Sequence, residues 1–140
     1  MDRARSFTSG REACAGEVIL LDTNAVLFLS ADHRRARPLK RQSGQLYFTP
    51  FALLEMQFLQ EAGRGRFTSA APVETVKQDP RWSVDDPPLE GVIARAIGLT
   101  WTRDPFDRLI AAHALYRGWR LATSDTVMIR NLPTGAILPL

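Results

Sequence analysis

Short apolar runs alternate with helical repeats along this chain. The runs are typical of buried strands, and they lie at Val18–Leu21, Gln45–Phe48 and residues 119–123 and 135–138. Apolar residues recur at helical spacing in the segments between them, which predicts helices over residues 25–29, 51–59, Leu89–Ile97, 104–117 and 126–130. Strands that alternate with helices indicate a parallel sheet covered on both faces. We therefore predict a three-layer α/β/α domain over residues 17–140, with about five parallel strands.

Three stretches carry weaker patterns. Residues 67–88 contain four scattered prolines, and we predict one short helix near residues 73–77 and a short strand or connector at 81–84. Residues 32–41 contain five basic side chains and predict a charged surface helix or loop. Residues 1–16 combine arginines with small polar residues and show no period, so we predict a disordered tail there.

The segment Arg103-Asp-Pro-Phe-Asp-Arg-Leu-Ile-Ala-Ala-His-Ala114 begins with a helix start signal. Proline suits the first helical turn and the preceding Asp104 can cap it, so Asp107 becomes the third helical residue. Asp107 then begins a stripe of small residues that includes Ala111 and Ala114. A carboxylate on such a closely packed stripe is unusual for a solvated charge. Attraction of Asp107 to the positive end of the helix is an equal alternative.

The composition restricts the class of protein. A chain of 140 residues, of which 45% are hydrophobic and 24% charged, is typical of one soluble globular domain. The single cysteine, Cys14, excludes an internal disulfide and favours a cytoplasmic protein, and the apolar runs are too short to span a membrane. The net charge is +3, and almost all of the basic residues are arginines, whose guanidinium group matches the geometry of phosphate. This favours a nucleic-acid or acidic-protein partner, although a basic soluble surface explains the same composition.

Four acidic residues occupy unusual places in the predicted fold. Asp22 and Asp125 follow strands, Asp107 lies in the first turn of a helix, and Glu55 is the one charge in the apolar segment 51–59. Because a parallel sheet brings strand ends and helix starts to one edge, we expect these four groups to converge. Two alternatives stay open: Asp22 acts only as a helix cap, and Glu55 faces solvent through a gap in the apolar surface.

Converging carboxylates need a compensating cation in a partly dry cleft. An oxygen-only site without histidine or cysteine suits Mg²⁺ or Mn²⁺, and such ions activate water and stabilise the oxygens of a phosphoryl displacement. The residues therefore indicate metal-dependent phosphodiester hydrolysis. The chain has no Gly-rich phosphate loop and no Gly-x-Ser-x-Gly elbow, and a Ser/His/Asp triad would need His33 or His113. We interpret His113 as a satisfied core residue.

The same residues resemble the PIN-domain family, and most of all the VapC-type toxins of bacterial toxin–antitoxin pairs. The resemblance rests on Leu20-Leu-Asp-Thr-Asn24, the isolated Glu55, the segment 103–114 and Leu121-Ala-Thr-Ser-Asp125, in this order along the chain. It implies a PIN-like fold and Mg²⁺- or Mn²⁺-dependent endoribonuclease activity with one or two ions. It also implies an RNA substrate, homodimers and inhibition by a small antitoxin protein.

The resemblance assigns the metal and catalytic roles by position. It implies that Asp22, Glu55 and Asp107 bind the first ion, and that Asp125 helps to hold a second or polarises the attacking water. Supporting roles are expected for four further residues: Thr23 and Thr123 orient carboxylates, Asp104 caps its helix with an indirect influence on the site, and Arg108 pairs with a site acid or contacts phosphate.

Two other classes of function compete with the nuclease. The first is a catalytically silent PIN-like module that binds nucleic acid or protein, and the presence of all four acids weighs against it. The second is a phosphoacceptor signalling domain, which would need a late lysine near the site. The chain has no lysine after Lys77. We therefore predict a metal-dependent ribonuclease, the toxin of a type II toxin–antitoxin pair.

Overall fold

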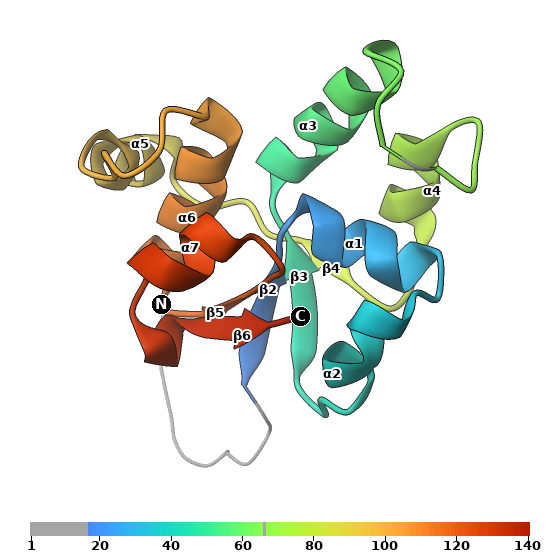
Figure 1. The fold of residues 1–140 in the computed structure, drawn as a ribbon, viewed down its shortest axis with the longest axis horizontal. Helices are drawn as coiled ribbons and strands as arrows, with labels where there is room; N and C mark the ends of the chain where they lie inside the picture. Colours follow the sequence, from blue (N-terminus) through green and yellow to red (C-terminus); the bar gives the residue numbers. More distant parts are fainter. Residues whose placement is uncertain (1–16, 66) are drawn as a thin grey trace.

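A five-stranded parallel sheet forms the centre of the molecule (Figure 1). The computed structural model describes residues 17–65 and 67–140, so the predicted tail over residues 1–16 lies outside the described residues. The strand order is β4-β3-β2-β5-β6. The strands are β2 (Val18–Leu21), β3 (Gln45–Phe48), β4 (Ser83–Val84), β5 (Arg120–Thr123) and β6 (Ile137–Pro139). The predicted parallel sheet and its strand number are confirmed.

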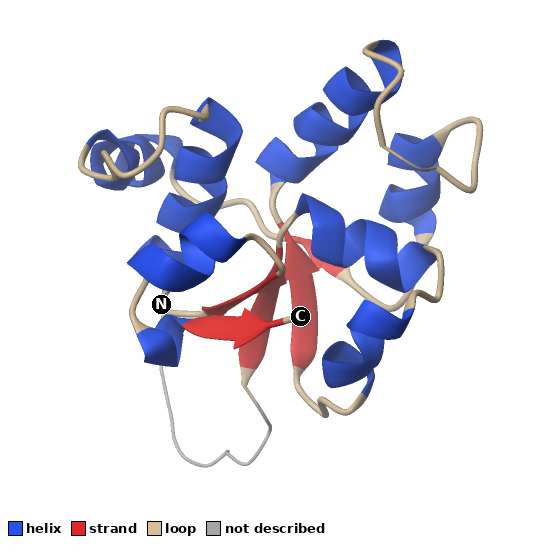
Figure 2. Cartoon of the chain, viewed as in Figure 1, coloured by secondary structure: helices blue, strands red, loops and turns tan. Residues whose placement is uncertain are grey.

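Helices cover both faces of this sheet (Figure 2). In the view of Figure 1, α1, α2, α3 and α4 lie on the right, and α5, α6 and α7 lie on the left. The α-helices are α1 (Thr23–Ser30), α2 (Arg37–Lys40), α3 (Pro50–Glu61), α4 (Pro72–Gln78), α5 (Leu89–Ile97), α6 (Pro105–Arg117) and α7 (Thr126–Asn131). Two 3₁₀ turns, η1 (Arg34–Ala36) and η2 (Thr134–Ala136), complete the described part of the chain. The architecture is the predicted three-layer α/β/α arrangement.

The central strand β2 explains the apolar run near the start of the domain. Ile19 and Leu21 pack with α1 and α2 in one core cluster, whereas Leu20 packs with α6 and α7 in another. All three side chains are fully buried. A strand that is covered on both faces has no polar side, and so the sequence shows no alternation there.

Several element boundaries differ from the sequence prediction. Helix α1 starts at Thr23 rather than at residue 25, because the side chain of Asp22 caps it. The predicted strand at 135–138 is shortened to Ile137–Pro139, since the amide of Ala136 donates to the carbonyl of Pro133 and closes a 3₁₀ turn. The charged stretch 32–41 forms η1 and α2, which agrees with the predicted surface helix.

Helices α3 and α6 begin with a capping residue and a proline as predicted, and α3 runs two residues past the predicted segment 51–59, to Glu61. The hydroxyl of Thr49 accepts a hydrogen bond from the amide of Phe51, and Asp104 accepts bonds from the amides of Phe106 and Asp107. Helix α6 ends at Gly118, whose positive φ of 70° a glycine adopts without strain. These caps place Glu55 in the second turn of α3 and Asp107 in the first turn of α6.

A buried polar cluster ties α6 to the segment after β4. His113 is fully buried, and its Nε2 lies 2.7 Å from Oδ2 of Asp85, while Nε of Arg117 donates to the same oxygen over 2.8 Å. Burial opposes the ionisation of Asp85, but the hydrogen bonds from His113 and Arg117 outweigh it and lower its pKa. His113 is thus a core residue as predicted, although its Nδ1 has no partner among the described residues.

Candidate metal centre

Five carboxylates line one cavity at the carboxyl edge of the sheet. The cavity has a volume of about 220 Å³. Its acidic residues are Asp22, Glu55, Asp104, Asp107 and Asp125. The structure therefore brings together the four acids that the sequence predicted to converge, and it adds Asp104 to them.

Asp22 reaches the cavity from the end of β2 and caps α1 at the same time. Its Oδ1 accepts a hydrogen bond of 2.7 Å from the amide of Ala25, and the residue is only 4% exposed. Burial raises the pKa of Asp22 to about 6, against the lowering effect of the Thr123 hydroxyl and the Ala25 amide; the charges of Glu55 and Asp125 raise it further. The cap interpretation and the site interpretation of Asp22 are thus compatible.

Glu55 lies on the cavity side of α3 rather than in open solvent. Its carboxylate is half-buried, and Oε1 accepts a hydrogen bond of 2.5 Å from the hydroxyl of Thr23. Burial raises the pKa of Glu55, and so do the charges of Asp104 and Asp125. Thr23 orients this carboxylate, which is the contact expected of a supporting hydroxyl.

Asp107 and Asp104 extend from the first turn of α6. Burial raises the pKa of Asp107 to about 7, and the charge of Asp104 makes the next largest contribution. Oxygens of Glu55, Asp104 and Asp107 lie within 4.8 Å of one another, which is a spacing that a metal ion could bridge. Asp104 therefore caps α6 as predicted and also belongs to the group of candidate ligands.

Asp125 lies at the start of α7. Its Oδ1 accepts hydrogen bonds from the amides of Val127 and Met128, over 2.8 and 3.1 Å. The amide of Asp125 itself donates to the hydroxyl of Thr123. Thr123 thus supports two acids, because it fixes the turn that carries Asp125 and lies against Asp22.

Arg108 does not pair with a site acid among the described residues. Its Nε donates to the carbonyl of Ala96 and one terminal nitrogen donates to the carbonyl of Ile97, over 3.0 and 2.8 Å. The guanidinium therefore binds the C-terminal carbonyls of α5. Of the two contacts expected of Arg108, the ion pair is not formed among the described residues, because Arg108 follows Asp107 by one residue and its side chain is rotated by more than a quarter of a helical turn toward α5. Its contact with phosphate stays a prediction.

The donor set and its charge fit a hard divalent cation. Within residues 17–65 and 67–140, no lysine, arginine or histidine forms an ion pair with any of the five acids. The cavity offers carboxylate oxygens, and no cysteine or histidine lines it in the part of the chain that the structure describes. Clustered carboxylates with raised pKa values and without a cationic partner are the setting in which a bound metal ion compensates the charge.

One sequence signal could have identified the role of Asp104. Asp104 and Asp107 are three residues apart, which places both at one side of a helix start. The expectation that Asp104 caps its helix and influences the site only indirectly left out its second carboxylate oxygen, because both capping bonds go to Oδ1.

Comparison with protein families identifies the fold. The family model for the PIN domain matches residues 19–132. The chain belongs to the PIN-domain family. The matched residues include all five acids of the cavity, so the candidate metal centre lies within the shared domain.

Solved structures share this fold over most of their length. The chain is similar to a chain of a toxin–antitoxin complex from Klebsiella pneumoniae, with 18% identity, a TM-score of 0.64 and coverage of 86% of this chain and 95% of that one. It is also similar to a chain of VapBC2 from Rickettsia felis bound to a promoter DNA fragment, with 15% identity, a TM-score of 0.64 and coverage of 88% and 98%. For PAE2754 from Pyrobaculum aerophilum the identity is 28%, the TM-score 0.56 and the coverage 91% and 87%.

Two further searches have negative results. No match was found among curated protein sequences. None of the helices in the described residues of this PIN domain is long and apolar enough to span a bilayer.

Proposed function

We propose that this PIN-domain protein is a metal-dependent endoribonuclease that hydrolyses RNA phosphodiester bonds. The observation that carries the proposal is the cavity with five carboxylates and no basic partner within the described residues. Such a cavity is built for a hard divalent ion, and phosphate oxygens complete the shell of such an ion in hydrolases. The excess of arginine in the chain favours a nucleic acid as the substrate.

The acids divide into two groups around the proposed ions. Glu55, Asp104 and Asp107 hold one Mg²⁺ or Mn²⁺ ion together with Asp22, and Asp125 helps to hold a second ion or polarises the attacking water. When bound, the metal lowers the pKa of a coordinated water and stabilises the attacking and leaving oxygens of the displacement.

The remaining groups prepare these carboxylates for binding. The Thr23 hydroxyl binds Oε1 of Glu55, and the Ala25 amide and the Thr123 hydroxyl bind the carboxylate of Asp22, so both carboxylates are held in place at the cavity. The starts of α1 and α6 also lie at the cavity, where the positive end of each helix dipole favours ionised carboxylates. The acids are therefore oriented before the metal arrives, which reduces the cost of binding.

We further infer that the protein is the toxin of a type II toxin–antitoxin pair, with a small antitoxin protein as its partner. The support is the similarity to chains from the Klebsiella and Rickettsia toxin–antitoxin complexes, each over more than four fifths of this chain. The toxin acts on RNA in the cytoplasm. Purified protein that carries no antitoxin should cleave RNA, and addition of the antitoxin should stop the cleavage.

We also propose a homodimer. Leu89, Ile93 and Ile97 lie one turn apart along α5 and are 61%, 40% and 69% exposed. An apolar stripe of this kind on a single helix marks a surface that is covered by another protein. A second copy of the chain would bury this stripe.

Cleavage of a mixed RNA pool tests the enzymatic proposal. The antitoxin-free protein is incubated with Mg²⁺, Mn²⁺ or EDTA, next to the Asp22→Asn variant and the Asp86→Asn variant. Asp86 is exposed and does not line the cavity, so its variant is the matched control. Cleavage that requires metal, disappears in Asp22→Asn and persists in Asp86→Asn supports the nuclease. No cleavage by folded wild-type protein with any metal would favour the catalytically silent binding module.

A further inference from the structure

A second cavity continues from the acid site along α1. It has a volume of about 340 Å³, which is within the range of small-ligand sites. We call it the α1 cavity, and its lining includes Asn24, Leu27, Phe28, Ala31, His33 and Leu59. Asn24 and Leu59 also line the acid cavity, so the two cavities are neighbours that share these two side chains.

Flat rings form the far end of the α1 cavity. The rings of Phe28 and His33 are stacked, with centroids 4.9 Å apart and an angle of 28° between their planes. Nδ1 of His33 accepts a hydrogen bond of 3.1 Å from the amide of Arg35, which fixes the ring at the start of η1. The guanidinium of Arg35 lies 6.0 Å from the centre of the Phe28 ring. Aromatic faces next to a guanidinium are typical of sites that stack nucleobases.

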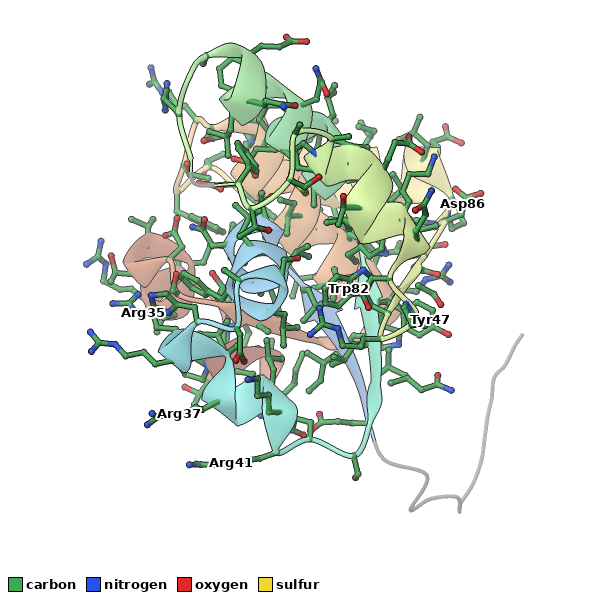
Figure 3. The ribbon with its side chains drawn as sticks, turned by 90° about the vertical axis from the view of Figure 1, so that its right-hand side faces the viewer. Arg35, Arg37, Arg41, Tyr47, Trp82 and Asp86 are labelled. Carbon is green, nitrogen blue, oxygen red and sulfur yellow. The ribbon has the colours of Figure 1, made fainter. Side chains whose placement is uncertain are left out.

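A basic surface begins where the α1 cavity ends. We call it the η1–α2 arginine patch, and it consists of the exposed residues Arg34, Arg35, Arg37 and Arg41. Figure 3 shows Arg35, Arg37 and Arg41 along one edge of the molecule, with their side chains directed away from the ribbon. The neighbouring Lys40 pairs with Asp32, whereas none of the four arginines forms an ion pair with another of the described residues. This patch is complementary to a polyanion.

We infer that single-stranded RNA leaves the acid site along α1, with one base in the α1 cavity and the following phosphates on the η1–α2 arginine patch. This inference rests on the proposed nuclease function and adds a base-binding site and a direction to it. The order of the features matches a polynucleotide, because acids for the scissile phosphate, an apolar cavity with aromatic faces and a row of arginines follow one another. Stacking accepts every base, so the site adds affinity without a strict sequence requirement.

Abasic substitution in the RNA tests the base site without changing the protein. The cleaved bond of a defined oligonucleotide is mapped first, and each base around it is then removed in turn. We expect one position next to the cleaved bond to lower kcat/KM by about tenfold, as the loss of one stacked base does. The effect belongs to the α1 cavity if it becomes smaller in His33→Leu, which removes one of the two rings that line this cavity, and an unchanged effect would place the base elsewhere. His33 is exposed, so its replacement spares the core.

Charge substitution tests the patch. In Arg37→Gln we expect kcat/KM for a long RNA to fall. The slope of log kcat/KM against log salt concentration should become less steep by about one, as the loss of one phosphate contact predicts. An RNA truncated on the side of the patch should be cleaved equally by wild type and Arg37→Gln. Arg95→Gln is the matched control, because Arg95 is exposed on α5, on the other side of the molecule in Figure 1.

The outcomes separate this inference from the nuclease proposal. Metal-dependent cleavage with no sensitive abasic position, or with equal loss on long and truncated RNA in Arg37→Gln, would overturn the RNA path and leave the nuclease intact. Variants that cleave RNA normally but resist inhibition by the antitoxin would show that the surface binds a protein instead. Absence of any cleavage by wild type would count against the nuclease itself.

Discussion

The carboxylates of the candidate metal centre differ in what surrounds them. Asp22 is almost fully buried and Asp107 is half-buried, and burial is the largest cause of the raised pKa of both groups. In the metal-free protein, ionisation of these two acids near neutral pH is therefore unfavourable, because it places charge in a buried site and next to other carboxylates. A folded-state pKa above the unfolded value means that these groups stabilise the fold below about pH 4 and lose that contribution as the pH rises through 6 to 7.

The first prediction concerns Asp107→Asn. The substitution should abolish cleavage, because it removes a candidate ligand charge. In EDTA at pH 8 it should raise the Tm by roughly 4 °C, equivalent to about 1 kcal/mol after allowance for solvent screening, since it removes a carboxylate that ionises unfavourably. At pH 4, where Asp107 is protonated, the two proteins should melt together. Thermal denaturation at both pH values measures this, and a lower Tm of the variant at pH 8 would contradict it.

The second prediction concerns Asp104→Asn. Asparagine caps helices about as well as aspartate, so the free energy of unfolding should change by less than about 0.5 kcal/mol. Because the carboxylate also belongs to the group with Glu55 and Asp107, the Mg²⁺ concentration for half-maximal cleavage should rise by about tenfold. A metal titration of cleavage measures the shift. Asp104→Ala, which lacks the cap, should instead lose about 1 kcal/mol of stability.

At the scale of elements, the packing of α6 decides the geometry of the site. Arg108 binds the last carbonyls of α5, and Arg117 and His113 bind Asp85 after β4. These contacts hold both ends of the helix whose first turn carries Asp104 and Asp107. A shift of α6 would change the spacing of the acids. These contacts therefore influence the site only because they hold α6 in place.

The third prediction concerns Asp85→Asn. Its pKa is lowered by His113 and Arg117, so the charged form stabilises the fold above the unfolded pKa, and this contribution is lost as the pH falls through the lower folded value. Loss of the charge leaves a buried histidine and an arginine without their acid, which should cost about 3 kcal/mol at pH 7. Urea denaturation measures the loss. Asp86→Asn, at the exposed neighbouring residue, is the control and should change stability by less than about 0.5 kcal/mol.

At the scale of the whole molecule, the surface divides into regions of different character. The acid cavity opens at the carboxyl edge of the sheet, the η1–α2 arginine patch lies beyond α1, and the apolar stripe lies on α5. Figure 1 shows α5 and α2 on opposite sides of the sheet. A dimer formed through α5 would therefore leave the proposed RNA path accessible in both copies.

The fourth prediction concerns this dimer. Ile97→Glu places a charge at the most exposed residue of the α5 stripe, and it should convert a dimer into a monomer that stays folded. Light scattering coupled to size exclusion measures the mass. Val84→Glu is the control, because Val84 is another exposed apolar residue, 47% exposed, and lies on the edge strand β4 away from α5. A wild-type protein that is monomeric at high concentration would refute the proposal.

The sequence alone determined the local elements and the identity of the main acids. Helix ends depend on neighbours within a few residues, so the sequence alone predicts them. Examples are the N-caps Thr49 and Asp104 and the left-handed residue Gly118 that ends α6. The convergence of Asp22, Glu55, Asp107 and Asp125 followed from one general rule, that parallel strands end at a common edge. These features need no knowledge of side-chain packing.

The tertiary structure decided which side chains meet across elements. The second role of Asp104, the turn of Arg108 toward α5, and the pairing of Asp85 with His113 depend on distances between segments that are 11 to 49 residues apart in sequence. The α1 cavity is likewise defined by α1 and α3 together. Such distances are set by how helices pack on the sheet, and a change of one residue in helical position turns a side chain from one partner to another. Local patterns therefore predict the elements and their chemistry, whereas packing selects the contacts.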